Sequence, residues 1–268
     1  MRYIIRMEVI KMLVSDIFKC IDEFAPFNIC EEFDNVGLLV GDAKRNVSNV
    51  LISLDLTSGV LNQAKNIDAE LIITHHPIIF KPLKHIYSDE LITQVINSGI
   101  SVICAHTNLD KVNGGVNDVL AEILGLKDIK ILENSLEYGR IGHLSEKLDC
   151  DSFIKHVAKK LNTSVRATRF NGSIETVAVL GGAGEFAWSE AKKSGADAFV
   201  TGESKHHIFI EAKRNSFCFV DAGHFETEVL VCKALRDRLQ NKFKNQVNFV
   251  VAEQENPVCF CCGDNIWL

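Results

Sequence analysis

The sequence predicts an α/β fold with largely parallel sheets, organised as two related α/β domains. Short apolar runs rich in Val, Ile and Leu alternate along the chain with stretches of helical periodicity, which is typical of parallel sheets covered by helices. Several of these runs end in polar turns that carry histidine or carboxylate side chains. A strand–helix–strand segment of the first half also recurs in the second half, which indicates an internal duplication.

The composition limits the classes of protein to consider. With 268 residues, 47% of them apolar, the chain can form one large domain or two ordinary ones with ample cores. A net charge of -6 argues against a strongly nucleic-acid-binding surface and leaves room only for a local basic patch. No apolar run approaches membrane-spanning length, and the start lacks a signal-peptide core. We therefore expect a cytoplasmic protein without a membrane partner, whose nine cysteines stay reduced.

The first half is predicted to alternate helices and strands. Ser15 is expected to cap a first helix and Thr57 a second. Ser88 opens a third helix, which ends at Gly99, and a fourth helix ends at Gly125. Short apolar strands are expected within residues 33–42 and at residues 50–54, 71–74 and 101–105.

An irregular, polar region at residues 127–142 is taken as the boundary between the two domains. The first domain then comprises residues 1–130 and the second residues 131–268, with C-terminal strands expected to pack back on the first. In the second domain the pattern predicts helices at residues 151–161 and about 225–244, and strands at 176–180, 198–201 and 217–220.

The repeat is the most informative feature of the chain. Residues 50–74 align without gaps on residues 177–201, and His76 then falls on Glu203. After a nine-residue deletion in the second copy, His106 falls on His224 and Asp110 on Glu228. An H-x-x-x-D motif in one half thus matches an H-x-x-x-E motif in the other, which indicates two related halves that each offer ligands at strand ends.

His75 and His76 follow the apolar run at residues 71–74 directly. Neighbouring side chains on an extended strand point to opposite sides, so both imidazoles serve one site only if that site is crowded, as with two metal ions. Imidazole and carboxylate suit zinc, iron or manganese, and a carboxylate can bridge two ions that polarise substrate and activate water. The candidate ligands and proton carriers are His75, His76, His106, Asp110, Glu203, His207, His224 and Glu228.

Plainer explanations exist for several motifs. Asp34 and Asn35 are ordinary turn formers, and Glu203 and His207 also suit helix capping. The glycine-rich segment at residues 181–184 suits either a phosphate cradle or a tight strand-to-helix turn. The cysteines at residues 259–262 are read as side chains of a terminal strand rather than as metal ligands, because they lack a C-x-x-C spacing.

Together these motifs resemble the GTP cyclohydrolase 1 type 2-like family, also called YbgI-like or NIF-three-like proteins, over almost the whole chain. Two positions depart from the family pattern: Phe33 stands where the family usually has Trp, and Glu203 where it often has Asp. The motifs that carry the resemblance are Asp34-Asn35-Val36-Gly37-Leu38-Leu39-Val40-Gly41, Thr74-His75-His76-Pro77, His106-Thr107-Asn108-Leu109-Asp110, Thr201-Gly202-Glu203 and Asp221-Ala222-Gly223-His224-Phe225-Glu226-Thr227-Glu228.

The resemblance implies two related α/β domains with a dinuclear metal site in the cleft between them. It also implies two divalent metal ions per subunit, self-association into a toroidal homohexamer, and a short form without the inserted domain of longer relatives. His106 would be an auxiliary ligand, and Glu228 would bridge the two ions. By motif position the metal ligands would be His75, His76, Asp110, His224 and Glu228.

The family name implies a hydrolase that opens the imidazole ring of GTP and releases formate. Metal-activated water would attack the purine nucleotide, and Glu203 or His207 would carry protons as the catalytic residues. Two alternatives stay open, because fold and metal site do not fix a substrate. One is a metal-dependent phosphoesterase, and the other is a non-enzymatic, ring-shaped, metal-binding regulatory or interaction protein.

Overall fold

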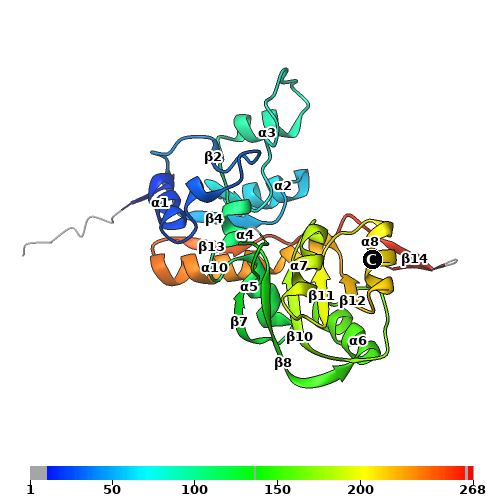
Figure 1. Ribbon diagram of the computed structural model, residues 1–268. Helices are drawn as coiled ribbons and strands as arrows, with labels where there is room; N and C mark the ends of the chain where they lie inside the picture. Colours follow the sequence, from blue (N-terminus) through cyan, green and yellow to red (C-terminus); the bar gives the residue numbers. More distant parts are fainter. Residues whose placement is uncertain (1–10, 136, 263–264, 268) are drawn as a thin grey trace, which may run out of the picture. The chain divides into compact units, whose positions relative to one another are not determined.

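The computed structural model describes residues 11–135, 137–262 and 265–267 (Figure 1). By contacts between residues, the chain divides into two compact units. Unit 1 comprises the chain up to His106 together with Arg236–Ala252, and unit 2 comprises Thr107–Leu235 together with the residues from Glu253 onward. Each unit contains a β-sheet with helices packed against it, which confirms the predicted α/β class. The division into domains at residues 130 and 131 stays a prediction.

Unit 1 is built on a five-stranded sheet. Its order is β13 (Asn248–Val251), β4 (Asn49–Ser53), β5 (Leu71–Thr74), β6 (Ser101–Cys104) and β2 (Gly37–Val40). The first four strands are parallel, and the edge strand β2 is antiparallel to β6. Figure 1 shows β13, which comes from late in the chain, beside β4. Every residue of β5 and β6 is buried, which explains why both read as almost continuous apolar runs.

In the part of unit 1 that precedes unit 2 in the chain, the described residues also form three α-helices and shorter elements. Two of the helices pack on one face of the sheet, where Val60, Leu61 and Val95 lie against Leu51 and Ile72. The elements are β1 (Met12–Leu13), α1 (Val14–Phe24), the 3-10 helix η1 (Phe27–Ile29), β3 (Asn46–Val47), α2 (Ser58–Asn66) and α3 (Leu91–Ser98).

The predicted caps of unit 1 are confirmed in part. The Thr57 hydroxyl accepts a hydrogen bond from the Val60 N–H and caps α2. Gly99 ends α3 in the left-handed conformation, at φ 70°. The expected caps at Ser15 and Ser88 are wrong, because α1 begins one residue before Ser15 and α3 begins only at Leu91.

Unit 2 contains a six-stranded sheet with three parallel strands at its centre. Its outer strands are antiparallel to their neighbours. The expectation of less regular structure at residues 127–142 is wrong for residues 127–131 and 140–142, because β7 lies at the first and β8 begins at the second. Most β7 side chains are exposed, so its sequence lacks the apolar alternation of a half-buried strand. The order is β7 (Lys127–Ile131), β8 (Arg140–Asp149), β10 (Ser173–Leu180), β11 (Ala198–Thr201), β12 (Cys218–Asp221) and β9 (Arg166–Ala167).

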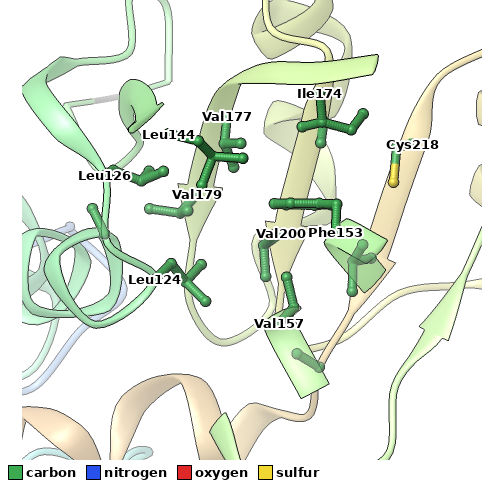
Figure 2. Packing of buried hydrophobic residues seen from close by; sticks show 14 of the residues in the cluster. Leu124, Leu126, Leu144, Phe153, Val157, Ile174, Val177, Val179, Val200 and Cys218 are labelled. Atoms are coloured by element: carbon green, nitrogen blue, oxygen red, sulfur yellow. The ribbon is translucent and has the colours of Figure 1, made fainter. Parts of the chain in front are cut away.

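Helices cover both faces of this sheet. Figure 2 shows Val177, Val179 and Val200 on one face beside Phe153 and Val157 of a covering helix. Alternate strand residues, among them Phe199 and Phe219, pack with Trp188 in a separate cluster. The helices are α4 (Thr107–Lys111), α5 (Val116–Ile123), α6 (Cys150–Leu161), the 3-10 helix η2 (Glu185–Ala187), α7 (Trp188–Lys193), α8 (His206–Arg214) and α9 (His224–Glu228).

The end of the chain departs from the expected single long helix. Two helices, α9 and α10 (Leu230–Phe243), replace it, and α10 starts in unit 2 and ends in unit 1. After β13, the strands β14 (Phe260–Cys262) and β15 (Asn265–Trp267) pair with each other in an antiparallel hairpin. No helix of the described residues is long and apolar enough to cross a membrane.

The two sheets share the strand register that the repeat predicts. Val50 pairs with Leu71 in β4 and β5, and Val177 pairs with Ala198 in β10 and β11, as the ungapped alignment requires. The third strand differs by one residue, because Ser101 of β6 occupies the place of Cys218 in β12. When the two halves are aligned by strand register, His106 corresponds to Gly223 rather than to His224. The motif alone had placed the alignment gap one residue away from the position that the strands require.

Hydrogen bonds outside the strands repeat as well. The Glu70 carboxylate accepts from the N–H groups of Ser48 and Asn49, at 2.9 Å each. The Asp197 carboxylate accepts from the N–H groups of Glu175 and Thr176, also at 2.9 Å each. Glu70 and Asp197 are equivalent in the ungapped alignment, and the two pairs of N–H groups become equivalent when the same offset is extended by two residues. In each unit, a carboxylate that directly precedes one strand therefore binds the backbone of the neighbouring strand, at the start of β4 in unit 1 and at the register shift within β10 in unit 2.

Candidate metal centre

The three histidines of unit 1 lie together at the carboxyl ends of β5 and β6. The chain bends after Thr74, and the His76 N–H donates to the Leu54 carbonyl at 2.9 Å. Because the backbone is no longer extended there, the rings of His75 and His76 lie on one side, with centroids 5.1 Å apart. The His106 ring is 5.1 Å from His75 and 5.5 Å from His76. One nitrogen of each ring lies within 4.8 Å of the other two, so the group could hold a metal ion.

Each of these imidazoles is held through its Nδ1 atom. Nδ1 lies 2.9 Å from the Ala105 carbonyl in His75, 2.8 Å from the Asp55 carboxylate in His76 and 2.9 Å from the Asp34 carboxylate in His106. Since the partner is an acceptor in every case, Nδ1 carries a proton, and in the neutral ring the lone pair is then on Nε2. Metal-binding histidines commonly show this arrangement, in which a carboxylate or carbonyl fixes the tautomer and the ring orientation.

Asp34 and Asp55 orient two of the candidate ligands, a role that the sequence did not predict. Asp34 does end a turn, since its N–H donates to the Glu31 carbonyl at 3.0 Å, but its fully buried side chain also holds His106. Asp55 follows the end of β4, next to β5, and a carboxylate in that position of a parallel sheet is the signal that could have identified it. His106, expected as an auxiliary ligand, lies in the same group as His75 and His76.

Unit 2 holds a second group of candidate ligands on α9. His224 and Glu228 share a helix face, with Nε2 and a carboxylate oxygen 3.0 Å apart. The other ring nitrogen of His224 lies 3.2 Å from the Glu203 carboxylate. Glu228 is buried, with 5% of its surface exposed, whereas the Glu203 side chain is 65% exposed. The His224 imidazole thus contacts the buried Glu228 carboxylate through one ring nitrogen and is oriented by the exposed Glu203 carboxylate through the other.

The glycine-rich loop after β10 acts as a tight turn. Gly182 has φ +59°, and a Cβ atom there would lie 2.1 Å from a carboxylate oxygen of Glu228. Three N–H groups of the loop donate to side chains of the same unit, so these groups are not directed at a phosphate. The donations run from Gly181 to Asn117, from Gly182 to Thr227 and from Gly184 to Thr201.

The other predicted site residues lie on separate elements of unit 2. Asp110 is half-buried in α4, and the Asn117 amide donates to its backbone carbonyl at 3.3 Å. The same buried Asn117 accepts from the Gly181 N–H at 2.8 Å, which ties the Asp110 turn to the loop beside Glu228. His207 is exposed in the first turn of α8. Of the C-terminal cysteines, Cys259 is exposed, and the side chains of those at residues 261 and 262 lie outside the described part of the chain.

Comparison with known proteins identifies close relatives over almost the whole chain. The sequence profile of Duf34/NIF3 (NGG1p interacting factor 3) matches residues 12–257. Two proteins named GTP cyclohydrolase 1 type 2 homolog are similar to it. The one from Clostridium perfringens is 34% identical over 256 residues, which cover 91% of this chain and 97% of the relative. The one from Clostridium acetobutylicum is 34% identical over 262 residues, which cover 91% of this chain and 96% of the relative.

A solved structure supports the same relationship. The crystal structure of a Staphylococcus aureus hypothetical protein superposes with a TM-score of 0.89 at 30% sequence identity, covering 94% of this chain and 100% of that chain. The predicted resemblance is therefore confirmed. Because the alignments span nearly the full length of both Clostridium relatives, these proteins share the short form without a large inserted domain.

Proposed function

The chain belongs to the Duf34/NIF3 family, and from this premise we propose that it is a metal-dependent hydrolase acting on a purine nucleotide. Opening of the imidazole ring of GTP is the leading case, in line with the name of its relatives. The observation that carries the proposal is the group of His75, His76 and His106, in which every Nδ1 is engaged by an oxygen acceptor. That donor set suits a divalent transition metal.

The proposal includes a centre of two divalent ions with ligands from both units. His75 and His76 would supply imidazoles from unit 1, and His106 would join them. Zinc, iron and manganese all suit such ligands. A bound ion supplies a Lewis acid that polarises the substrate and lowers the pKa of water. From unit 2, the proposed ligands are Asp110, His224 and the bridging Glu228.

The protein side chains would position these ligands and move protons. Asp55 and Asp34 hold their imidazoles in the tautomer with the lone pair on Nε2. Glu203 already accepts a hydrogen bond from His224, so we assign it first to orienting that ring. As a proton carrier Glu203 would have to release this bond, whereas His207 is exposed and available for proton exchange with solvent. Both residues stay in the proposal as catalytic candidates.

We also infer that the two units arose by internal duplication and that the protein forms a toroidal homohexamer. The duplication is supported by the shared register of two strand pairs and by the equivalent carboxylates of Glu70 and Asp197. The hexamer rests on membership of the family. Light scattering of the purified protein tests it, and a mass of one or two chains would contradict it.

The test of function is to offer GTP to protein loaded with a defined metal. Formate release without free phosphate supports ring opening. Free phosphate without formate would indicate that the protein is a phosphoesterase instead, since the same metal ligands serve either reaction. If neither product forms, and Glu228→Gln removes both the metal and the ring assembly, the protein is a structural or regulatory metal protein.

Two ligand variants and a control test the metal centre separately from the reaction. His106→Ala and His224→Ala should lower metal content measured by elemental analysis. His143→Ala is the matched control, because this exposed imidazole lies on β8 and contacts Thr176 instead of the site. Metal content equal to wild type in both ligand variants would disprove the site.

A further inference from the structure

Two exposed aromatic rings of unit 1 lie beside the histidine group. Phe33 is 64% exposed and Phe80 is 45% exposed, and their ring centroids are 6.3 Å apart with planes tilted by 52°. The Phe80 centroid is 6.5 Å from that of His106, one of the candidate ligands. Single exposed apolar side chains are common on protein surfaces. Two adjacent rings next to a candidate metal centre are a more specific arrangement.

The turn that contains Phe33 holds both rings in place. Asp34, the next residue, accepts from the ring of His106 at 2.9 Å. Asn35 donates through its side-chain amide to the Ile79 carbonyl at 2.6 Å, directly before Phe80. Consecutive residues of one turn therefore present an aromatic ring, fix a histidine and anchor the segment that carries the second ring. Directed hydrogen bonds of the neighbouring residues thus anchor, beside His106, the backbone that carries the two rings.

We infer that Phe33 and Phe80 form the surface on which the base of the nucleotide stacks, and so determine the preference for a flat heteroaromatic substrate. The inference rests on the proposed function and names the part of the substrate that unit 1 recognises. Every purine has a π-face, and stacking on an aromatic side chain is a sequence-tolerant way to bind it. The tilt between the rings makes a corner, so a base stacked on one ring meets the second with its edge. Phe80 lies next to His106, so a base stacked there is held close to the candidate ligands.

The experiment compares two probes that differ only in the base. Guanosine 5′-monophosphate and ribose 5-phosphate are titrated into metal-loaded wild type, Phe33→Ala, Phe80→Ala and the double variant by calorimetry. Wild type should bind the nucleotide more tightly than the sugar phosphate. Each single variant should weaken nucleotide binding about tenfold and leave sugar phosphate binding unchanged. Phe33→Trp should retain the preference, because the indole offers a larger stacking face.

Ile86→Ala is the matched control, since this residue is 58% exposed in the segment that follows Phe80. It should bind both probes as wild type does. The inference is overturned if wild type binds neither probe, or binds both equally, or if the double variant keeps the preference with its metal content intact. It is also overturned if the variants change only the oligomeric mass, since the rings would then be a contact between copies. Failure of GTP turnover with a retained base preference would reject the proposed reaction but not the stacking surface.

Discussion

At the scale of single residues, each histidine of the unit 1 group contacts an oxygen acceptor through Nδ1, which leaves Nε2 as the atom that can bind a metal ion. His75, His76 and His106 are recognisable from the sequence because they follow apolar strands. Their acceptors, Asp34, Asp55 and the Ala105 carbonyl, come from other strand ends and turns, so only the folded chain brings them together. The ligand types could be predicted because a strand end has a local sequence signature. The partners could not, because they depend on which strands are neighbours.

Asp55→Ala should therefore lower metal affinity although no proposed ligand is removed. The His76 ring would lose the acceptor that fixes its tautomer and orientation, and changes of this kind reduce affinity about 10–100-fold. Competition with a coloured chelator measures the change. Asp89→Ala, which removes an exposed carboxylate of the same unit, is the control and should bind metal as wild type does. An unchanged affinity in Asp55→Ala would show that His76 needs no acceptor to bind metal.

At the scale of elements, the glycine-rich loop after β10 forms a tight turn that lies against the Glu228 side chain of α9. Its sequence suited a phosphate cradle and a tight turn equally well. The structure favours the turn, because the N–H groups of Gly181, Gly182 and Gly184 donate within unit 2. Sequence could not decide between the two, since both require glycine for the same reason of backbone conformation. What distinguishes them is the set of acceptors for these N–H groups, Asn117, Thr227 and Thr201, which lie outside the loop.

Gly182→Ala and Gly125→Ala form a matched pair that separates backbone strain from the contact with Glu228. Both glycines have positive φ, +59° and +82°, so alanine should cost about 1–2 kcal/mol of stability at either position. Nothing lies within 4 Å of a Cβ at Gly125, whereas at Gly182 the Cβ would meet the Glu228 carboxylate. Because that carboxylate ends a flexible side chain, we expect it to move rather than the fold to fail.

The two alanine variants should therefore show similar losses in urea unfolding, but only Gly182→Ala should lose bound metal in elemental analysis. Equal metal content in both would show that Glu228 is no ligand or that it tolerates displacement. A far larger loss of stability for Gly182→Ala would show instead that the loop cannot adjust.

The first turn of α6 provides a pH-dependent test of capping. Hydrogen bonds from the Ser152 hydroxyl and from the Ser152 N–H to the Asp149 carboxylate lower the pKa of Asp149. Because the folded pKa is depressed, the stabilisation is fully present above the unfolded value of about 3.9 and is lost as pH falls through the folded pKa. Asp149→Asn keeps a good cap without a titrating group.

Wild type should thus lose more stability than Asp149→Asn on acidification below about pH 4, and the two should differ by a constant amount at neutral pH. Thermal unfolding followed by circular dichroism at a series of pH values measures this difference. Parallel curves down to the acid limit would show that the pKa of Asp149 is the same in the folded and unfolded chain.

At the scale of the whole molecule, the repeat explains why so much of the fold could be predicted. Two central strands and the helix between them recur, so each copy supports the assignment of the other. The one-residue error in placing His106 on His224 arose where the copies differ in length, since a gap in a loop has no local signature. The short edge strand β7 was missed for a related reason: an exposed strand has no hydrophobic period to detect.

The repeat also predicts that equivalent carboxylates do equivalent work. Glu70 accepts two backbone N–H groups at the start of β4, and Asp197 accepts two within β10, where its pairing with β8 shifts register. Hydrogen bonds to a charged acceptor are worth about 1.5–3 kcal/mol, so Glu70→Ala and Asp197→Ala should each destabilise the protein by roughly that amount. The effect of each substitution should be local, because the two carboxylates lie in different units.

Native-state hydrogen exchange resolves where the stability is lost. Glu70→Ala should accelerate exchange in β4 and β5 and leave β10 and β11 protected, and Asp197→Ala should do the reverse. Glu146→Ala, which removes an exposed carboxylate on β8, should change neither pattern. Acceleration in all four strands after either substitution would mean that the two units open as one cooperative body. Equal and separate effects would mean that each unit holds its strand in place through its own carboxylate.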